Sequence, residues 1–302
     1  MSSKLFVQKL FFPVALTGVF FINACNAPEK KTEDAIDSTA MNADTVAVLS
    51  KDTTSEVIAD FPPVSEVPAL LKLSGVDFNQ TLLNSPDKAK NYTTTADRSA
   101  LNLGVYASDL GYLAAYGKTQ PAITYIHSSN TLADHLGINT AYGAAMQKRF
   151  EQNISSTDSL AKIIDEGMHS ANKFLKENDQ KSTAALALTG GFIEGLYIST
   201  GLIETYPKNV PANVRDQALV SLIKTILKQK QTVADLIALL KASGQDAQIT
   251  EYVTSLEELH KKFEAVNFDK MISDNKGDLI VTDKTLADIA AQVKQIRAKI
   301  VG

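Results

Sequence analysis

Apolar residues recur at helical spacing along almost the whole chain from residue 64 onward. Side chains three and four positions apart share one face of an α-helix, so this pattern predicts amphipathic helices. They cover residues 67–74, 94–116, 120–136, 141–152, 156–177, 183–205, 212–230, 232–242, 247–266 and 284–300. A turn-rich stretch between two short apolar runs predicts one small β-hairpin near 270–282. We therefore expect an all-α bundle of about eight to ten helices.

Several helix ends carry residues that favour termination or capping. Thr94 and Asp97 form an N-terminal capping pair for the helix at 94–116. Gly244 suits a helix C-terminus, and Asp246 suits the start of the next helix. Asp283 similarly precedes the last helix. That helix carries basic side chains that we expect on its exposed face, namely Lys294, Arg297 and Lys299.

Two of the predicted helices, at 100–116 and 185–201, are apolar on nearly every side. Such a helix is either the centre of a bundle or a membrane span. Glu194 lies near the middle of the second helix, where a charge is costly in lipid, so we expect a buried helix packed through Gly191 and Gly195. A shift of 85 residues superimposes the two helices with four identities in fourteen positions. This similarity suggests two four-helix repeats, 94–178 and 182–267.

Each central helix also carries an acid followed three residues later by a tyrosine. Asp109 with Tyr112, and Glu194 with Tyr197, place a carboxylate and a phenol on one helix face. A buried carboxylate must be hydrogen-bonded or must shift its pKa upward, and both situations occur at functional sites. Two interpretations stay open: a polar site for a small ligand within the bundle, or structural hydrogen bonds that fix how the two helices cross.

A further pattern is shorter and less specific. Glu166 with His169, and Glu257 with His260, repeat a Glu-x-x-His spacing on two predicted helices. Together with Asp109 and Glu194 they resemble the ligand order of ferritin-like di-iron proteins. The apolar stripe of the first helix leaves His169 facing outward, so surface side chains are the alternative interpretation. The test is convergence of all six side chains.

Composition narrows the function. The chain has 30 Lys and Arg against 34 Asp and Glu, a net charge of −4, so no general basic field exists for nucleic acid. A single cysteine excludes a disulfide framework and a cysteine-based zinc site. Neither a phosphate-binding glycine loop nor a G-x-S-x-G turn occurs. These observations favour a non-catalytic role.

The N-terminus resembles that of a bacterial lipoprotein precursor. Lys4 and Lys9 precede an uncharged run that is too short to span a bilayer, and the run ends at Ile22-Asn23-Ala24-Cys25. The resemblance implies a signal peptide over residues 1–24, diacylglycerol on the Cys25 sulfur, usually with a further acyl chain on its amine, and anchoring to a membrane. Asn26 replaces the Asp that would suggest inner-membrane retention in some bacteria, so the outer membrane is preferred.

Residues 25–63 predict a tether, because eight acids and three lysines lie among polar and small residues there. We thus expect an all-helical domain at 64–302, held in the periplasm or at the cell surface. The expected role is binding or scaffolding, with an envelope protein as a candidate partner, no nucleic acid, and no cofactor beyond the covalent lipid. The alternative is a small-molecule or metal site that uses Asp109 and Glu194.

Overall fold

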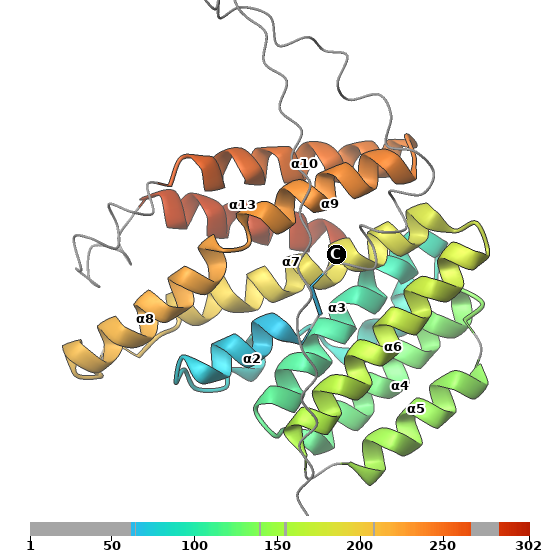
Figure 1. The fold of residues 1–302 in the computed structure, drawn as a ribbon, viewed down its shortest axis with the longest axis horizontal. Helices are drawn as coiled ribbons and strands as arrows, with labels where there is room; N and C mark the ends of the chain where they lie inside the picture. Colours follow the sequence, from blue (N-terminus) through green and yellow to red (C-terminus); the bar gives the residue numbers. More distant parts are fainter. Residues whose placement is uncertain (1–61, 64, 139, 154–155, 208, 267–283) are drawn as a thin grey trace, which may run out of the picture. The chain divides into compact units, whose positions relative to one another are not determined.

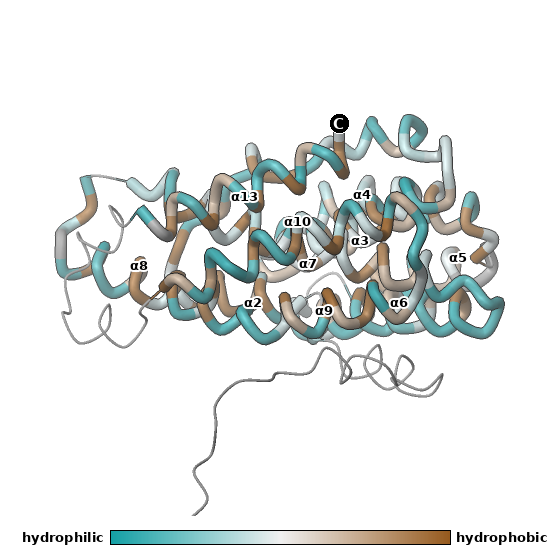
Figure 2. Tube along the Cα trace, turned by 90° about the horizontal axis from the view of Figure 1, so that it is seen from above, coloured by the Kyte–Doolittle hydropathy of each residue, from teal (hydrophilic) through white to brown (hydrophobic). Residues whose placement is uncertain are grey.

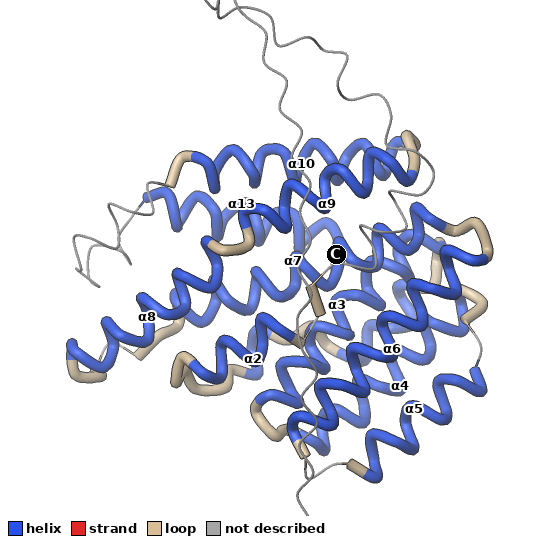
Figure 3. The backbone as a smooth tube through the Cα atoms, in the orientation of Figure 1, coloured by secondary structure: helices blue, strands red, loops and turns tan. Residues whose placement is uncertain are grey.

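A computed structural model describes residues 62–63, 65–138, 140–153, 156–207, 209–266 and 284–302. These residues form ten α-helices and two short 3-10 helices and contain no strand, which confirms the all-α prediction (Figures 1 and 3). Three predictions lie outside the described residues: the hairpin at 270–282, Cys25, and the tether except for Pro62 and Pro63. The α-helices are α2 (Glu66–Leu73), α3 (Ala96–Ala115), α4 (Thr119–His135), α5 (Thr140–Gln152), α6 (Thr157–Glu177), α7 (Lys181–Glu204), α8 (Ala212–Leu227), α9 (Lys230–Ser243), α10 (Ala247–Glu264) and α13 (Lys284–Val301).

The helix starts follow the capping chemistry of the sequence. Asp246 caps α10, since its carboxylate accepts a hydrogen bond from the Ile249 N–H. Thr95, one residue after the expected position, caps α3 by accepting from the Arg98 N–H. Gly244 is the residue at which α9 ends. The 3-10 helices η1 (Gln80–Leu82) and η2 (Pro86–Tyr92), which the periodicity did not predict, lead from α2 into α3.

Helices α3 and α7 form the centre of the helical domain. Every residue of α3 from Ser99 to Ala114 is buried, and so is nearly every residue of α7. In Figure 2 the two lie between α4 and α13 on one side and α2, α6 and α9 on the other. α7 is also the one helix of the described part that is long and apolar enough to cross a membrane. Its most apolar stretch is 89% buried within the protein, as expected for a core helix.

The two central helices touch backbone to backbone. A Cβ added to Gly104 would lie 1.9 Å from the Ala187 carbonyl oxygen, and one added to Gly190 would lie 1.8 Å from the Leu101 carbonyl oxygen. Gly104 also meets Gly191, and four residues further along both helices Ser108 meets Gly195, so α3 and α7 run parallel. The close approach therefore uses Gly104 and Gly190, and the predicted Gly191 takes part through its backbone nitrogen, 2.6 Å from the Cβ added to Gly104. Gly195 of the predicted Gly191–Gly195 pair meets its nearest atoms only at ordinary contact distance, 3.6–3.9 Å.

The remaining helices surround this pair unevenly. α4 and α6 pack on α3, and α5 packs on α4 and α6. α9 and α13 pack on α7, and α10 covers α9 and α13. Both predicted repeats thus contain four helices, but their helices meet different neighbours. The duplication remains a prediction.

Candidate functional site

The two predicted acids meet at the contact between α3 and α7. Asp109 and Glu194 are both fully buried, and each carboxyl group lies near enough to the other to affect its pKa. Their place follows from the parallel packing, which brings equivalent points of the two helices side by side. The two acids, which occupy equivalent positions on the two central helices in the sequence, thus meet in the structure.

The partner of this pair is Arg297 of α13. Its Nε and Nη2 donate to the Glu194 carboxylate at 2.7 and 2.9 Å, and its guanidinium lies 4.0 Å from the centre of the Tyr197 ring. The Arg297 side chain is only 13% exposed, so the expectation of a surface position was wrong. The helix register explains this: Arg297 follows Val293 by four residues and precedes Ile300 by three, and both of these are buried.

The cluster contains two acids, Asp109 and Glu194, but only one base, Arg297. The pKa shifts of the two acids indicate which of them is paired with the base. Burial raises the pKa of Asp109 well above its usual value, and the nearby Glu194 raises it further. Burial also raises the pKa of Glu194, against the opposing effect of the Arg297 guanidinium. Arg297 thus balances the charge of Glu194, whereas burial favours the neutral form of Asp109, whose Oδ1 has no hydrogen-bond partner among the described residues. A neutral Asp109 leaves no unpaired buried charge in the cluster.

The two tyrosines of the predicted site separate. Tyr197 stacks under Arg297, whereas the Tyr112 hydroxyl accepts a hydrogen bond from the Asn79 N–H at 2.9 Å. The Tyr112 ring packs on Phe78 and Tyr116 in a second apolar cluster beneath α2. Tyr112 therefore helps to attach the segment before α3, whereas Tyr197, which also packs against this cluster, contacts Arg297.

The acid cluster also lies beside further contacts that hold α13. The Asn102 amide donates to the Ile300 carbonyl at 3.0 Å, the Tyr92 hydroxyl donates to the Val301 carbonyl at 3.2 Å, and Arg98 donates to the Gly302 carbonyl. These donors satisfy carbonyls that the last turn of a helix leaves unpaired. The chemistry of the cluster is therefore that of an anchor for α13.

The six side chains of the di-iron pattern do not converge. Glu166 pairs with Arg149 at 2.7 Å, and Glu257 pairs with Lys241 at 2.7 Å. His169 is exposed, and His260 faces Glu264 at 4.0 Å. Within the described ranges, no three His, Cys, Asp or Glu side chains are grouped to hold a metal ion.

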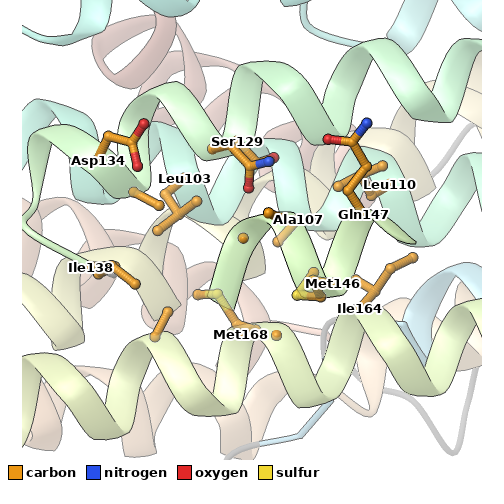
Figure 4. A pocket seen from close by; sticks show the side chains of 16 residues that line it. Leu103, Ala107, Leu110, Ser129, Asp134, Ile138, Met146, Gln147, Ile164 and Met168 are labelled. Atoms are coloured by element: carbon orange, nitrogen blue, oxygen red, sulfur yellow. The ribbon is translucent and has the colours of Figure 1, made fainter. Parts of the chain in front are cut away.

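A cavity of about 200 Å³ lies among α3, α4, α5 and α6 (Figure 4). Its wall is mainly apolar and includes Leu103, Ala107 and Leu110 of α3 with Ile164, Met168 and Ala171 of α6. Met146 of α5 covers it and packs on Gly167, where an added Cβ would lie 2.3 Å from the Met146 sulfur. Two wall residues, Asp134 and Ala144, are exposed, so the cavity reaches the surface.

Sequence reasoning did not find this cavity, because its residues read as ordinary core positions. Neither Asp109 nor Glu194 lines it. The sequence gives only indirect signs of the cavity. Gly143 and Gly167 lack side chains and leave space, and the flexible thioethers of Met146 and Met168 can line an irregular gap.

No protein-family model matches this chain, and neither a curated protein nor a solved structure shows a detectable match to it.

Proposed function

We propose that the protein is a lipid-anchored cell-envelope protein whose helical domain binds a small apolar molecule without transforming it. The cavity among α3, α4, α5 and α6 is the observation that carries the binding role. Ligand sites are concave and mostly apolar with a few polar groups, which describes this cavity. The N-terminal signal pattern and Cys25 support attachment to a membrane, with the outer membrane preferred and the domain in the periplasm or at the cell surface.

The volume limits the ligand. An engineered apolar cavity of about 150 Å³ holds benzene, so about 200 Å³ accommodates one ring or a short alkyl chain. Burying five methylene groups at about 0.8 kcal/mol each contributes roughly 4 kcal/mol, which corresponds to a Kd of about 1 mM. A six-carbon alcohol is thus a suitable probe of the site.

A cavity, as opposed to a surface patch, favours a small molecule over a protein partner. Among the described residues, the exposed large hydrophobic side chains are Leu73 and Val214. Docking of a protein would call for a contiguous apolar patch of several hundred Å². A scaffolding role with an envelope protein remains the alternative proposal.

Filling the cavity should abolish binding. Ala107 is labelled in Figure 4 on the α3 wall, and Ala107→Leu places three more carbons in the free space. We expect the full-length protein to bind 1-hexanol at about 1 mM in ligand-observed NMR, and the variant to weaken this at least tenfold.

Ala69→Leu is the matched control, because Ala69 is exposed on α2 and does not line the cavity. Equal hexanol binding by wild type and the Ala107→Leu variant would contradict the cavity as the site. No hexanol binding by wild type would remove the binding proposal itself.

Membrane attachment has a separate test. If Cys25 carries the lipid, Cys25→Ala should shift the protein from the membrane to the soluble fraction and abolish incorporation of labelled palmitate. Ser38→Ala, in the expected tether, should leave both unchanged. Retention of the Cys25→Ala protein in carbonate-washed membranes would show that another element holds it there.

A further inference from the structure

The polar residues of the cavity carry information on its ligand. α4 contributes Ser129, Asn130 and Asp134, and α5 contributes Gln147. In Figure 4 Ser129, Asp134 and Gln147 lie along the apolar wall, with Asp134 and Gln147 well separated. Asp134 is the one charged residue of the wall, and no lysine or arginine lines the cavity.

Ser129 and Gln147 already have hydrogen-bond partners within the protein, whereas the Asp134 carboxylate can interact with a ligand. The Ser129 hydroxyl donates to the Tyr125 carbonyl at 2.9 Å, and the Gln147 amide donates to Glu151 at 3.0 Å. Asp134 forms no ion pair with any residue that the structure describes. An exposed carboxylate keeps its hydration while the cavity is empty.

The cavity wall holds no basic side chain that would offset the charge of Asp134. Arg149, two residues after Gln147, is engaged by Glu166 of α6 at 2.7 Å. His135, next to Asp134, has its Nδ1 2.9 Å from the Ser99 hydroxyl. The exposed end of the cavity is therefore marked by one negative charge without a basic counterpart in its wall.

Resting on the proposed function, we propose that the cavity selects amphiphiles with a short apolar group and a cationic or neutral polar end, and disfavours anionic ones. The apolar group enters between α3 and α6, and the polar end stays at the exposed side near Asp134. An amine there meets an opposite charge, an alcohol meets a hydrogen-bond acceptor, and a carboxylate meets a like charge. Fatty-acid-type anions are thereby set apart from amines and alcohols of the same length.

The test uses three probes with one apolar group: hexylamine, 1-hexanol and hexanoate, titrated at pH 7 and low salt into the full-length protein. Because Asp134 is exposed, the charge effect is modest, and we expect hexylamine to bind about fivefold more tightly than 1-hexanol, with hexanoate weakest. The difference should shrink at 0.5 M salt, since screening weakens exposed charges.

Asp134→Asn should bring the amine and the alcohol to equal affinity, because it removes the charge and keeps an amide oxygen as the hydrogen-bond acceptor. Asp158→Asn is the matched control, because Asp158 lies at the start of α6 and does not line the cavity. Hexanoate binding as tight as hexylamine, or an amine preference that survives Asp134→Asn, would overturn the selectivity while leaving the proposed function intact. Failure of all three probes to bind would overturn the proposed function, and the selectivity with it.

Discussion

Arg297→Met should lower the free energy of unfolding by about 3–5 kcal/mol at neutral pH, the range for removing one partner of a buried ion pair. Arg297 donates twice to Glu194, which is fully buried beside Asp109. Without the guanidinium, the buried Glu194 carboxylate has no base to balance its charge. Urea unfolding followed by circular dichroism measures the loss.

This loss should depend on pH in a definite direction. Burial raises the pKa of both carboxyls above their unfolded values of about 4, and removing Arg297 raises the pKa of Glu194 further. Groups with raised folded pKa stabilise the protein below the unfolded pKa, and that stability is lost as pH rises through the folded pKa. The Arg297→Met variant should therefore approach the wild type as pH falls towards about 4.

Two variants make the result specific. Lys294, on α13 like Arg297, forms a half-exposed ion pair with Glu204 of α7, and Lys294→Met should cost no more than about 1 kcal/mol. Adding Glu194→Gln to Arg297→Met should restore more than half of the lost stability, because the uncompensated charge is gone. If Arg297→Met costs as little as Lys294→Met, the cluster does not anchor α13 as described.

Gly104→Ala should destabilise the protein by about 3 kcal/mol or more, above the usual range for overpacking. The new Cβ would lie 1.9 Å from the Ala187 carbonyl oxygen and 2.6 Å from the Gly191 nitrogen. Both are backbone atoms, so no side chain can rotate away, and α3 and α7 must separate. Alanine's better helix propensity, worth about 1 kcal/mol, offsets only part of this.

Gly195→Ala is the matched control on α7. Its added Cβ meets only side-chain atoms at 3.6–3.9 Å, which is ordinary contact. We expect this variant to be as stable as wild type or up to about 1 kcal/mol more stable, because a helical alanine replaces a glycine. Both variants are compared in the same urea titration, and equal stability of the two would contradict the close approach of α3 to α7 at Gly104.

Much of the fold follows from apolar spacing and capping residues. α6 and α10 begin and end within two residues of the predicted positions, because their apolar stripes are regular and their starts are marked by Ser156 and Asp246. The segment at Gln80–Tyr92 was missed, since 3-10 turns are short and have no periodic apolar face.

The candidate sites, too, were only partly predictable from the sequence. Asp109 and Glu194 could be found because acids stand out on apolar helices. Their partner Arg297 could not be found by composition, because arginine is usually exposed, although its position between Val293 and Ile300 placed it on the buried face. The cavity depends on how side chains of four helices fit together, and no single-helix pattern encodes that.

The contacts that hold α13 join residues far apart in the chain: 103 positions separate Arg297 from Glu194, and 209 separate Val301 from Tyr92. Closing such long loops costs chain entropy before any of the contacts is gained. While α13 is undocked, Glu194 lacks its counter-ion and the interface between α3 and α7 stays incomplete. The folding of the central helices is thereby coupled to the arrival of the last helix, so we expect native packing to form late, in one cooperative step, and slowly for an all-helical protein.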